Sequence, residues 1–339
     1  RRQVDLTVKQ VQADLSFEND FRLPVDVEIV AAAGRATHTV TLEGWTTRTS
    51  LPAETKPLAV VFDKGNWLVS ELRFERPLAE RLHLLGHGDV GDQLRATRQI
   101  VQEHPRQPEA ALALARLLAD PKTHWGVRQE AAVALGTIGG DAAATALAAA
   151  AKDADPRVRR AVATGLGIAG GDRSAVVLRA LAQGDAAEDV VGTAAVSLGR
   201  IHAPGARDFL KAQLARDSRW YEEIRTGVVK GLAELEDPTL ATVFASYLDP
   251  RYPRQLRQAA LEGWFRAAPT DPALVLRLRE LTGDRNRTLR EEALTKLGLL
   301  HRATDAPFLR DLAKTEVDPT LAEEARAAAD EIDAFIPKP

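Results

Sequence analysis

The sequence predicts an antiparallel β-sandwich followed by an α/α solenoid, or superhelix, of seven to eight helical hairpins. Three observations predict this order. Residues 1–77 alternate apolar and polar side chains with period two, apolar residues after about residue 88 recur with helical spacing, and this second part repeats every 31 to 34 residues. We therefore expect the sandwich over residues 1–77, a linker over 78–90 and the solenoid over 91–336.

Short strands separated by turn residues define the first part. Around Val27, apolar residues alternate with acidic ones, as in a strand with one buried face. The tetrapeptide Asp63–Asn66 predicts a tight hairpin turn, because its glycine can adopt positive φ. We expect a strand from Trp67 to Phe74 to leave this turn.

Each repeat of the second part contains a helix with three apolar anchors spaced at i, i+4 and i+8, such as Val158, Val162 and Leu166. One hairpin cannot bury this stripe alone, so neighbouring hairpins must stack. The third anchor recurs at Leu135, Leu166, Leu198, Leu232, Trp264, Leu297 and Ala329.

A second helix precedes the anchor helix in each repeat, and an aspartate often opens it, in several cases with proline close behind. Such an aspartate is a strong N-cap signal. The expected caps are Asp141, Asp172, Asp237, Asp271 and Asp305. Alanine and glycine at positions 132, 134, 136, 163, 165 and 167 are expected to let neighbouring helices approach closely.

The repeat resembles HEAT repeats of the short type found in phycobilisome-lyase-like proteins. The segment Asp155–Arg159, followed by Ala161, Ala163 and Leu166-Gly167, carries the resemblance, which covers roughly residues 90–335. Because such repeats occur on many unrelated proteins, the fold alone does not imply a lyase activity. The glycine after the anchor is lost at Ala233, Phe265 and Asp330.

The first part resembles the β-domain that follows the catalytic domain in the aminopeptidase N family of zinc metallopeptidases. The segments that carry this resemblance are 8–12, 21–27, 57–63 and 67–74. In that family a helical, often HEAT-like, domain comes next, and the order agrees here. The family's zinc helix requires His-Glu-x-x-His, and this sequence contains no His-Glu dipeptide. The family's Gly-x-Met-Glu-Asn strand is also missing.

The resemblance therefore implies a non-catalytic C-terminal portion of an aminopeptidase N-like enzyme, which walls the active-site cavity and gates peptide access. It implies no catalytic, cofactor-binding or metal-ligating residue in this chain; zinc would lie in the upstream catalytic domain. That domain, or a peptide or protein segment, is the expected partner. The alternative is a free-standing HEAT-repeat scaffold for protein–protein interaction.

The 339 residues contain no methionine and begin at Arg1, so we expect a piece of a longer polypeptide, or a sequence from which modified methionines were dropped. The formal net charge of −3 argues against nucleic-acid binding. The apolar runs 58–62 and 146–151 are too short to span a membrane. Cysteine is absent, which excludes disulfides and thiolate chemistry but selects no compartment.

Two sets of residues recur in register with the repeats. An arginine follows the first anchor at Arg128, Arg159, Arg225, Arg257 and Arg290. These arginines form either a ladder for an anionic ligand or, as we favour, a structural ladder to neighbouring repeats. The aromatic residues Trp125, Trp220, Tyr221 and Tyr252 precede the anchors. They either form an interaction edge or fill gaps between loops.

A histidine pair, His83 and His87, has the i, i+4 spacing of zinc ligands, with Asp89 close by. A zinc site needs three or four convergent ligands, and Gly86 and Gly88 weaken a helix there. We therefore interpret this segment as part of the linker.

Overall fold

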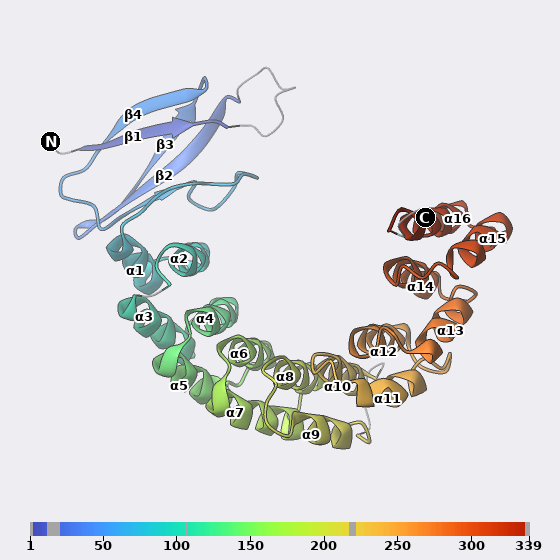
Figure 1. Cartoon of the computed structure of the whole chain (residues 1–339). Helices are drawn as coiled ribbons and strands as arrows, with labels where there is room; N and C mark the ends of the chain where they lie inside the picture. The colour runs from blue at the N-terminus through green and yellow to red at the C-terminus, as the bar shows by residue number, and fades with distance from the viewer. Residues whose placement is uncertain (1–2, 12–20, 106, 217–221, 336–339) are drawn as a thin grey trace. The chain divides into compact units, whose positions relative to one another are not determined.

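The computed structural model describes residues 3–11, 21–105, 107–216 and 222–335. Two compact units make up the chain, Arg1–Ala169 and Gly170–Pro339. Within the described residues, the first unit contains five strands and six helices, and the second contains ten further helices and one short 3-10 helix (Figure 1). A β-region followed by helical repeats is therefore the order that the sequence predicts.

The strands form two small antiparallel sheets. Strand β1 (Gln3–Lys9) pairs with β4 (Thr46–Pro52), whereas β2 (Leu23–Ala31) lies between β3 (Gly34–Leu42) and β5 (Ala59–Phe62). Side chains from both sheets share one hydrophobic core, made of Val25, Val27, Ile29, Val40, Leu42, Leu51, Ala53, Val60 and Phe62. The predicted antiparallel strands are confirmed. The structure shows two small sheets, and the finer prediction of a β-sandwich is not established by them.

The prediction of a strand from Trp67 to Phe74 is wrong, because these residues form no strand. The turn at Asp63–Asn66 is present, with positive φ at Asp63, Gly65 and Asn66, but it does not lead into a hairpin. The Asp63 carboxylate accepts hydrogen bonds from the backbone amides of Trp67 and Leu68, both at 3.1 Å. These bonds direct the chain away from β5, so the following residues pack on the core without joining a sheet.

Residues 78–87, predicted as part of the linker, form helix α1 (Leu78–His87). Its buried face carries Leu84 and Leu85, and it packs on β5 and on helix α2 (Val90–Glu103). The two glycines that argue against a helix do not prevent it, because Gly86 lies on the exposed side and Gly88 is the C-cap. Tertiary burial outweighs their low helix propensity.

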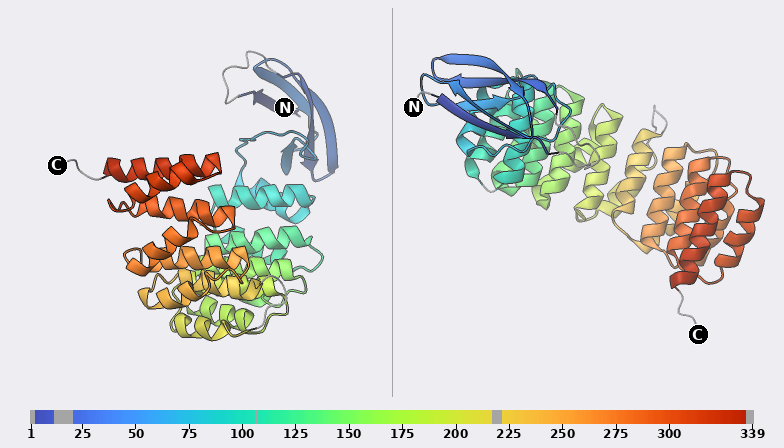
Figure 2. Two further views of the ribbon diagram at one scale, coloured as in Figure 1. Left: turned by 90° about the vertical axis from the view of Figure 1, so that its right-hand side faces the viewer. Right: turned by 90° about the horizontal axis from the view of Figure 1, so that it is seen from above.

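The remaining helices follow as antiparallel hairpins, which Figure 2 shows in two further views. In the first unit they are α3 (Pro108–Ala119), α4 (Trp125–Ile138), α5 (Gly140–Ala150) and α6 (Pro156–Ala169). The second unit contains α7 (Gly171–Gly184), α8 (Glu188–Arg200), α9 (Ala206–Gln213), α10 (Glu223–Ala233), η1 (Pro238–Leu240), α11 (Ala241–Ser246), α12 (Arg254–Ala267), α13 (Pro272–Leu281), α14 (Arg287–Leu299), α15 (Ala306–Thr315) and α16 (Pro319–Phe335).

The predicted anchors are confirmed. All seven third anchors are buried, and they lie on the even-numbered helices α4 to α16. Of the predicted caps, Asp237 and Asp271 accept a bond from a backbone amide of the first turn. Asp141 and Asp172 are not caps: they lie inside the first turn, because the preceding Gly-Gly turns place glycine at the N-cap. Asp305 occupies the N-cap position but binds Arg279 instead.

Glycine sets the distance between two pairs of even-numbered helices, α4 with α6 and α8 with α10, as the small residues predict. A Cβ atom on Gly136 of α4 would come within 2.5 Å of the Gly165 carbonyl oxygen of α6. In the second unit, a Cβ on Gly231 of α10 would overlap the backbone of α8 at Ala195. These helices therefore touch backbone to backbone, and no larger residue fits without separating them.

We expect Gly231→Ala to destabilise the second unit by about 1–3 kcal/mol, because the new methyl group forces α8 and α10 apart. Gly184→Ala is the matched control: a Cβ there meets nothing within 4 Å, so this change should be neutral or slightly stabilising. Urea unfolding followed by circular dichroism measures both. Equal stabilities of the two variants would contradict the close approach.

Candidate functional site

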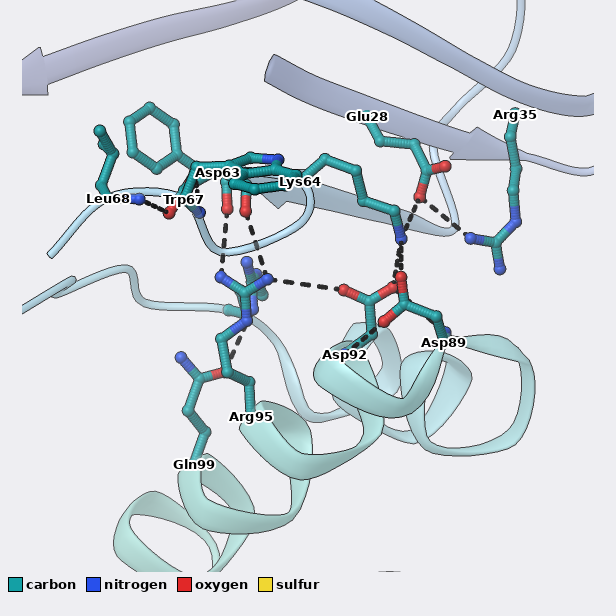
Figure 3. A network of polar contacts seen from close by, with 12 residues as sticks. Glu28, Arg35, Asp63, Lys64, Trp67, Leu68, Asp89, Asp92, Arg95 and Gln99 are labelled. Atoms are coloured by element: carbon teal, nitrogen blue, oxygen red, sulfur yellow. Dashed lines mark hydrogen bonds and ion pairs between the residues drawn. The ribbon is translucent and has the colours of Figure 1, made fainter. Parts of the chain in front are cut away.

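A network of ion pairs joins the strands to helix α2 within the first unit (Figure 3). The Lys64 ammonium nitrogen lies 2.7 Å from carboxylate oxygens of both Asp89 and Asp92, and 3.3 Å from Glu28 on β2. Asp89 and Asp92 also form a capping box at the start of α2, in which each side chain accepts from the other residue's backbone amide. One lysine thus connects the β-region to a helix N-terminus.

Burial makes these charges interdependent. The side chains of Asp92 and Glu28 are 1% and 8% exposed, and that of Lys64 is 20% exposed. Burial alone would lower the pKa of Lys64, but hydrogen bonds to Asp89 and Asp92 outweigh it and raise that pKa above its ordinary value. Burial would likewise raise the pKa of Asp89, and its bond to Lys64 lowers it instead. Both shifts favour the charged forms of Lys64 and Asp89 at neutral pH.

Two arginines extend the network. Arg95 of α2 donates to the carbonyl oxygens of Phe62 and Asp63, each at 3.4 Å, and so holds the turn after β5. Arg35 of β3 pairs with Glu28 at 3.0 Å and donates to the carbonyl oxygen of His87 at the end of α1. The network therefore fixes both helices of the first hairpin, α1 and α2, to the strands. We call its six residues the joint: Glu28, Arg35, Lys64, Asp89, Asp92 and Arg95.

The histidine pair lies at the end of α1. The His83 and His87 rings stack with centroids 4.6 Å apart, and the pKa of His83 is lowered by burial and by the neighbouring His87 and Arg35. Over residues 3–11, 21–105, 107–216 and 222–335, no group of three or more His, Cys, Asp or Glu side chains could hold a metal ion. The two histidines form a stacked pair in the last turn of α1.

The repeat arginines contact loops of their own unit. Arg128 of α4 forms a two-pronged ion pair with Asp153, at 2.9 and 3.0 Å, and Arg159 of α6 donates to the backbone carbonyl oxygen of the same Asp153. In the second unit, Arg257 and Arg290 contact the carboxylate and the carbonyl oxygen of Asp284 in the same way. One loop aspartate thus binds two successive arginines.

Arg225 contacts a different loop. It donates to the carbonyl oxygens of Leu214 and Arg216, at 3.0 and 3.3 Å, and pairs with Glu222. All five repeat arginines therefore bond to loop backbone, to acidic side chains, or to both. A ligand would have to displace these contacts, and the structural interpretation of the ladder stays a prediction.

The aromatic set is divided. In the first unit, the Arg157 guanidinium lies over the Trp125 ring, with its Cζ atom 3.6 Å from the ring centroid. Tyr252 packs against Tyr247, with ring centroids 5.2 Å apart, in the second unit. Trp220 and Tyr221 lie outside the described residues. An interaction edge formed by these residues therefore stays a prediction.

Sequence reasoning missed the joint. The Asp89-x-x-Asp92 spacing is a signal for a helix start, because aspartate is a strong N-cap and acidic residues favour the first turn. Nothing local to Lys64 reveals that it reaches across to this helix. The loop aspartates Asp153 and Asp284 were missed too, although each lies just before a repeat's anchor helix.

Comparison with known proteins identifies the repeats. Residues 124–199 match the HEAT-repeat family. No curated protein sequence matches the chain. Among the described residues, no helix combines the length and apolar character needed to cross a bilayer.

Several solved structures align with the chain. Aminopeptidase A of Legionella pneumophila, solved with aspartic acid, aligns with 98% of this chain at 11% identity and a TM-score of 0.56; the chain spans 47% of that enzyme. A chain of the CpcE–CpcF complex of phycocyanin lyase from Nostoc sp. PCC7120 covers 80% of this chain and 98% of its own length, at 17% identity and a TM-score of 0.39. Human deoxyhypusine hydroxylase covers 70% and 86%, at 20% identity and a TM-score of 0.36.

We expect Lys64→Met to destabilise the first unit by about 3 kcal/mol, because it leaves the buried Asp92 and Glu28 without their shared cation. Lys56→Met, at an exposed lysine of the same β-region, is the control and should change stability by less than about 0.5 kcal/mol. Urea unfolding measures both variants. A silent Lys64→Met would show that the joint does not hold the unit together.

Acid should weaken the joint. Because the pKa of Asp89 is lowered in the folded state, its contribution to stability is present above about pH 4, its unfolded value, and is lost as pH falls through the folded pKa. Asp89→Asn keeps an N-cap and removes the charge, so it should flatten the fall in stability that sets in as pH drops below about 4. Thermal unfolding across this range tests it, with Glu109→Gln in α3 as the control. An unchanged slope would contradict the coupling.

Proposed function

We propose that this chain is the non-catalytic C-terminal portion of an aminopeptidase N-like zinc metallopeptidase, where it walls the active-site cavity and limits which peptides enter. The observation that carries the proposal is the alignment of nearly the whole chain, β-region and helical repeats in the same order, with 47% of the Legionella aminopeptidase. In this proposal, the two small sheets with their shared core are the β-sandwich of that architecture.

The chemistry of bond cleavage would lie outside this chain. The sequence has no His-Glu-x-x-His and no cysteine, so its residues offer no zinc helix of that family. Zinc and the general base would belong to the upstream catalytic domain. The contribution of the chain would be steric and electrostatic: helices that carry Val158 and its equivalents would line the wall that incoming peptides meet.

The joint supports this role physically. A wall that selects peptides by size must hold its position relative to the domain that it adjoins. The ion pairs of Lys64 and Arg95 fix the first helical hairpin on the β-region. The β-region could therefore pass its orientation to the first repeats without a flexible linker.

We expect the isolated chain with added zinc to show no chelator-sensitive hydrolysis of aminoacyl p-nitroanilides. The reading frame of the natural protein should contain His-Glu-x-x-His upstream of residue 1, and its intact mass should be about twice that of this chain, in line with the 47% alignment. Robust chelator-sensitive turnover by the chain alone would overturn the non-catalytic assignment.

The second candidate is a free-standing scaffold that binds a protein segment. The match of residues 124–199 to HEAT repeats favours it, because stacked helical hairpins offer extended surfaces for partners. A natural polypeptide that begins near residue 1, without a catalytic domain, would select this candidate. An upstream His-Glu-x-x-His would select the peptidase.

A further inference from the structure

A groove of about 570 Å³ opens beside strand β1 in the first unit. One wall is Leu6–Lys9 of β1, continued by Val11, and the other is the segment Glu71–Phe74, with Phe62 of β5 between them. We call residues 68–74 the ribbon. Consecutive residues, both inward-pointing and outward-pointing, line each wall. The groove therefore faces the edges of two extended backbones and not one face of a sheet.

Both walls alternate with the period of a strand. On β1, Val4, Leu6 and Val8 pack on the core of the β-region, and on the ribbon Leu68, Leu72 and Phe74 do the same. The residues between them, such as Thr7 and Arg73, point away from that core. The ribbon thus has the side-chain pattern of a strand but belongs to neither sheet among the described residues.

Among the described residues, the sheet of β1 contains β1 and β4, and no strand pairs with residues Leu6–Lys9 on the groove side. Such an edge presents backbone donors and acceptors that can pair with another strand. Two strands alone form a sheet of marginal stability, and a third strand stabilises it. The groove therefore lies where a further strand would complete hydrogen bonding.

We propose that the groove binds an extended peptide segment of a partner protein, which adds a strand to β1 and lies between it and the ribbon. The four wall residues of β1 span about 13 Å in extended form, which sets the bound core at four or five residues. The walls require apolar side chains at alternate positions of the peptide, facing the core through Leu6, Phe62 and Leu72.

Charge at the rim specifies the outward residues of the peptide. Lys9 forms no ion pair within the described residues, whereas Arg73 pairs with Glu71 and both side chains are about 80–90% exposed. Among the described residues of the rim, Lys9 is therefore the positive charge without an acidic partner, and an acidic residue at an outward position of the peptide would pair with it. The partner is thus a segment that alternates apolar with acidic or small polar residues.

The test uses the whole chain and a nine-residue probe peptide in which valine and leucine alternate with glutamate and threonine. Titration is followed by the methyl resonances of Leu6, Val8 and Leu72 in a leucine- and valine-labelled sample, with Leu178 of the second unit as an internal reference. We expect shifts confined to the groove methyl groups. Methylation of alternate peptide amides should weaken binding about tenfold or more, since it removes the backbone bonds that define strand addition.

A charge exchange supplies the second arm. Lys9→Glu should weaken the acidic probe about two- to fivefold and improve binding of the same peptide with lysine for glutamate. Lys56→Glu, at an exposed lysine away from the groove lining, is the matched control and should change neither. Absence of binding, equal binding of a scrambled peptide, or insensitivity to amide methylation would overturn the proposal. So would backbone contacts between Thr7 and Arg73 in the free chain, which would mean that the ribbon itself closes the edge.

Discussion

The constraint on which this structure depends is that no helical hairpin of the chain can bury its own apolar stripe. Each even-numbered helix carries anchors such as Val158 and Leu166 that are fully buried only because a neighbouring hairpin covers them. A stack of such hairpins leaves an uncovered stripe at each end. At the start of the chain, α1 contacts β5 as well as α2 and α3, so the β-region provides the cover. In the second unit, Arg310 of α15 binds Asp330 and Asp333 of the last helix, α16, so charged side chains lie at that end of the unit.

This arrangement explains why the joint is built from charges. An apolar contact between strands and helices could slide, whereas a lysine shared by Glu28, Asp89 and Asp92 satisfies all three carboxylates in one position only. Buried ion pairs contribute little net stability compared with apolar contacts of the same volume, but removing one partner costs much. The physical role of the joint is therefore to define orientation. It uses the N-terminus of α2, where the helix dipole already favours the two aspartates.

Period and spacing predict most of the helical part from sequence, because the apolar stripe, the glycine contacts and the repeat length all express one packing geometry. Leu135 and Leu166 could be placed 31 residues apart as buried anchors without any structure. Features that depend on distant residues could not be predicted. Helix α1 exists because Leu84 and Leu85 find a buried site, and the ribbon fails to become a strand because the Asp63 carboxylate holds the amides that follow it. The joint could not be predicted for the same reason, since helix α1 lies between Lys64 and Asp92 in the chain.

The same packing logic limits where function can reside. The arginines that recur in five of the seven repeats are engaged: Asp153 and Asp284 each bind two of them, one through the carboxylate and one through the backbone. A group that maintains loop geometry in this way cannot bind an incoming anion without loosening the repeat. In this structural interpretation, which stays a prediction, recognition would use groups that packing leaves unsatisfied. Among the described residues, the backbone groups of Leu6–Lys9 on the side of β1 away from β4 meet that condition, since a strand edge can gain a partner while every existing contact of the core is kept.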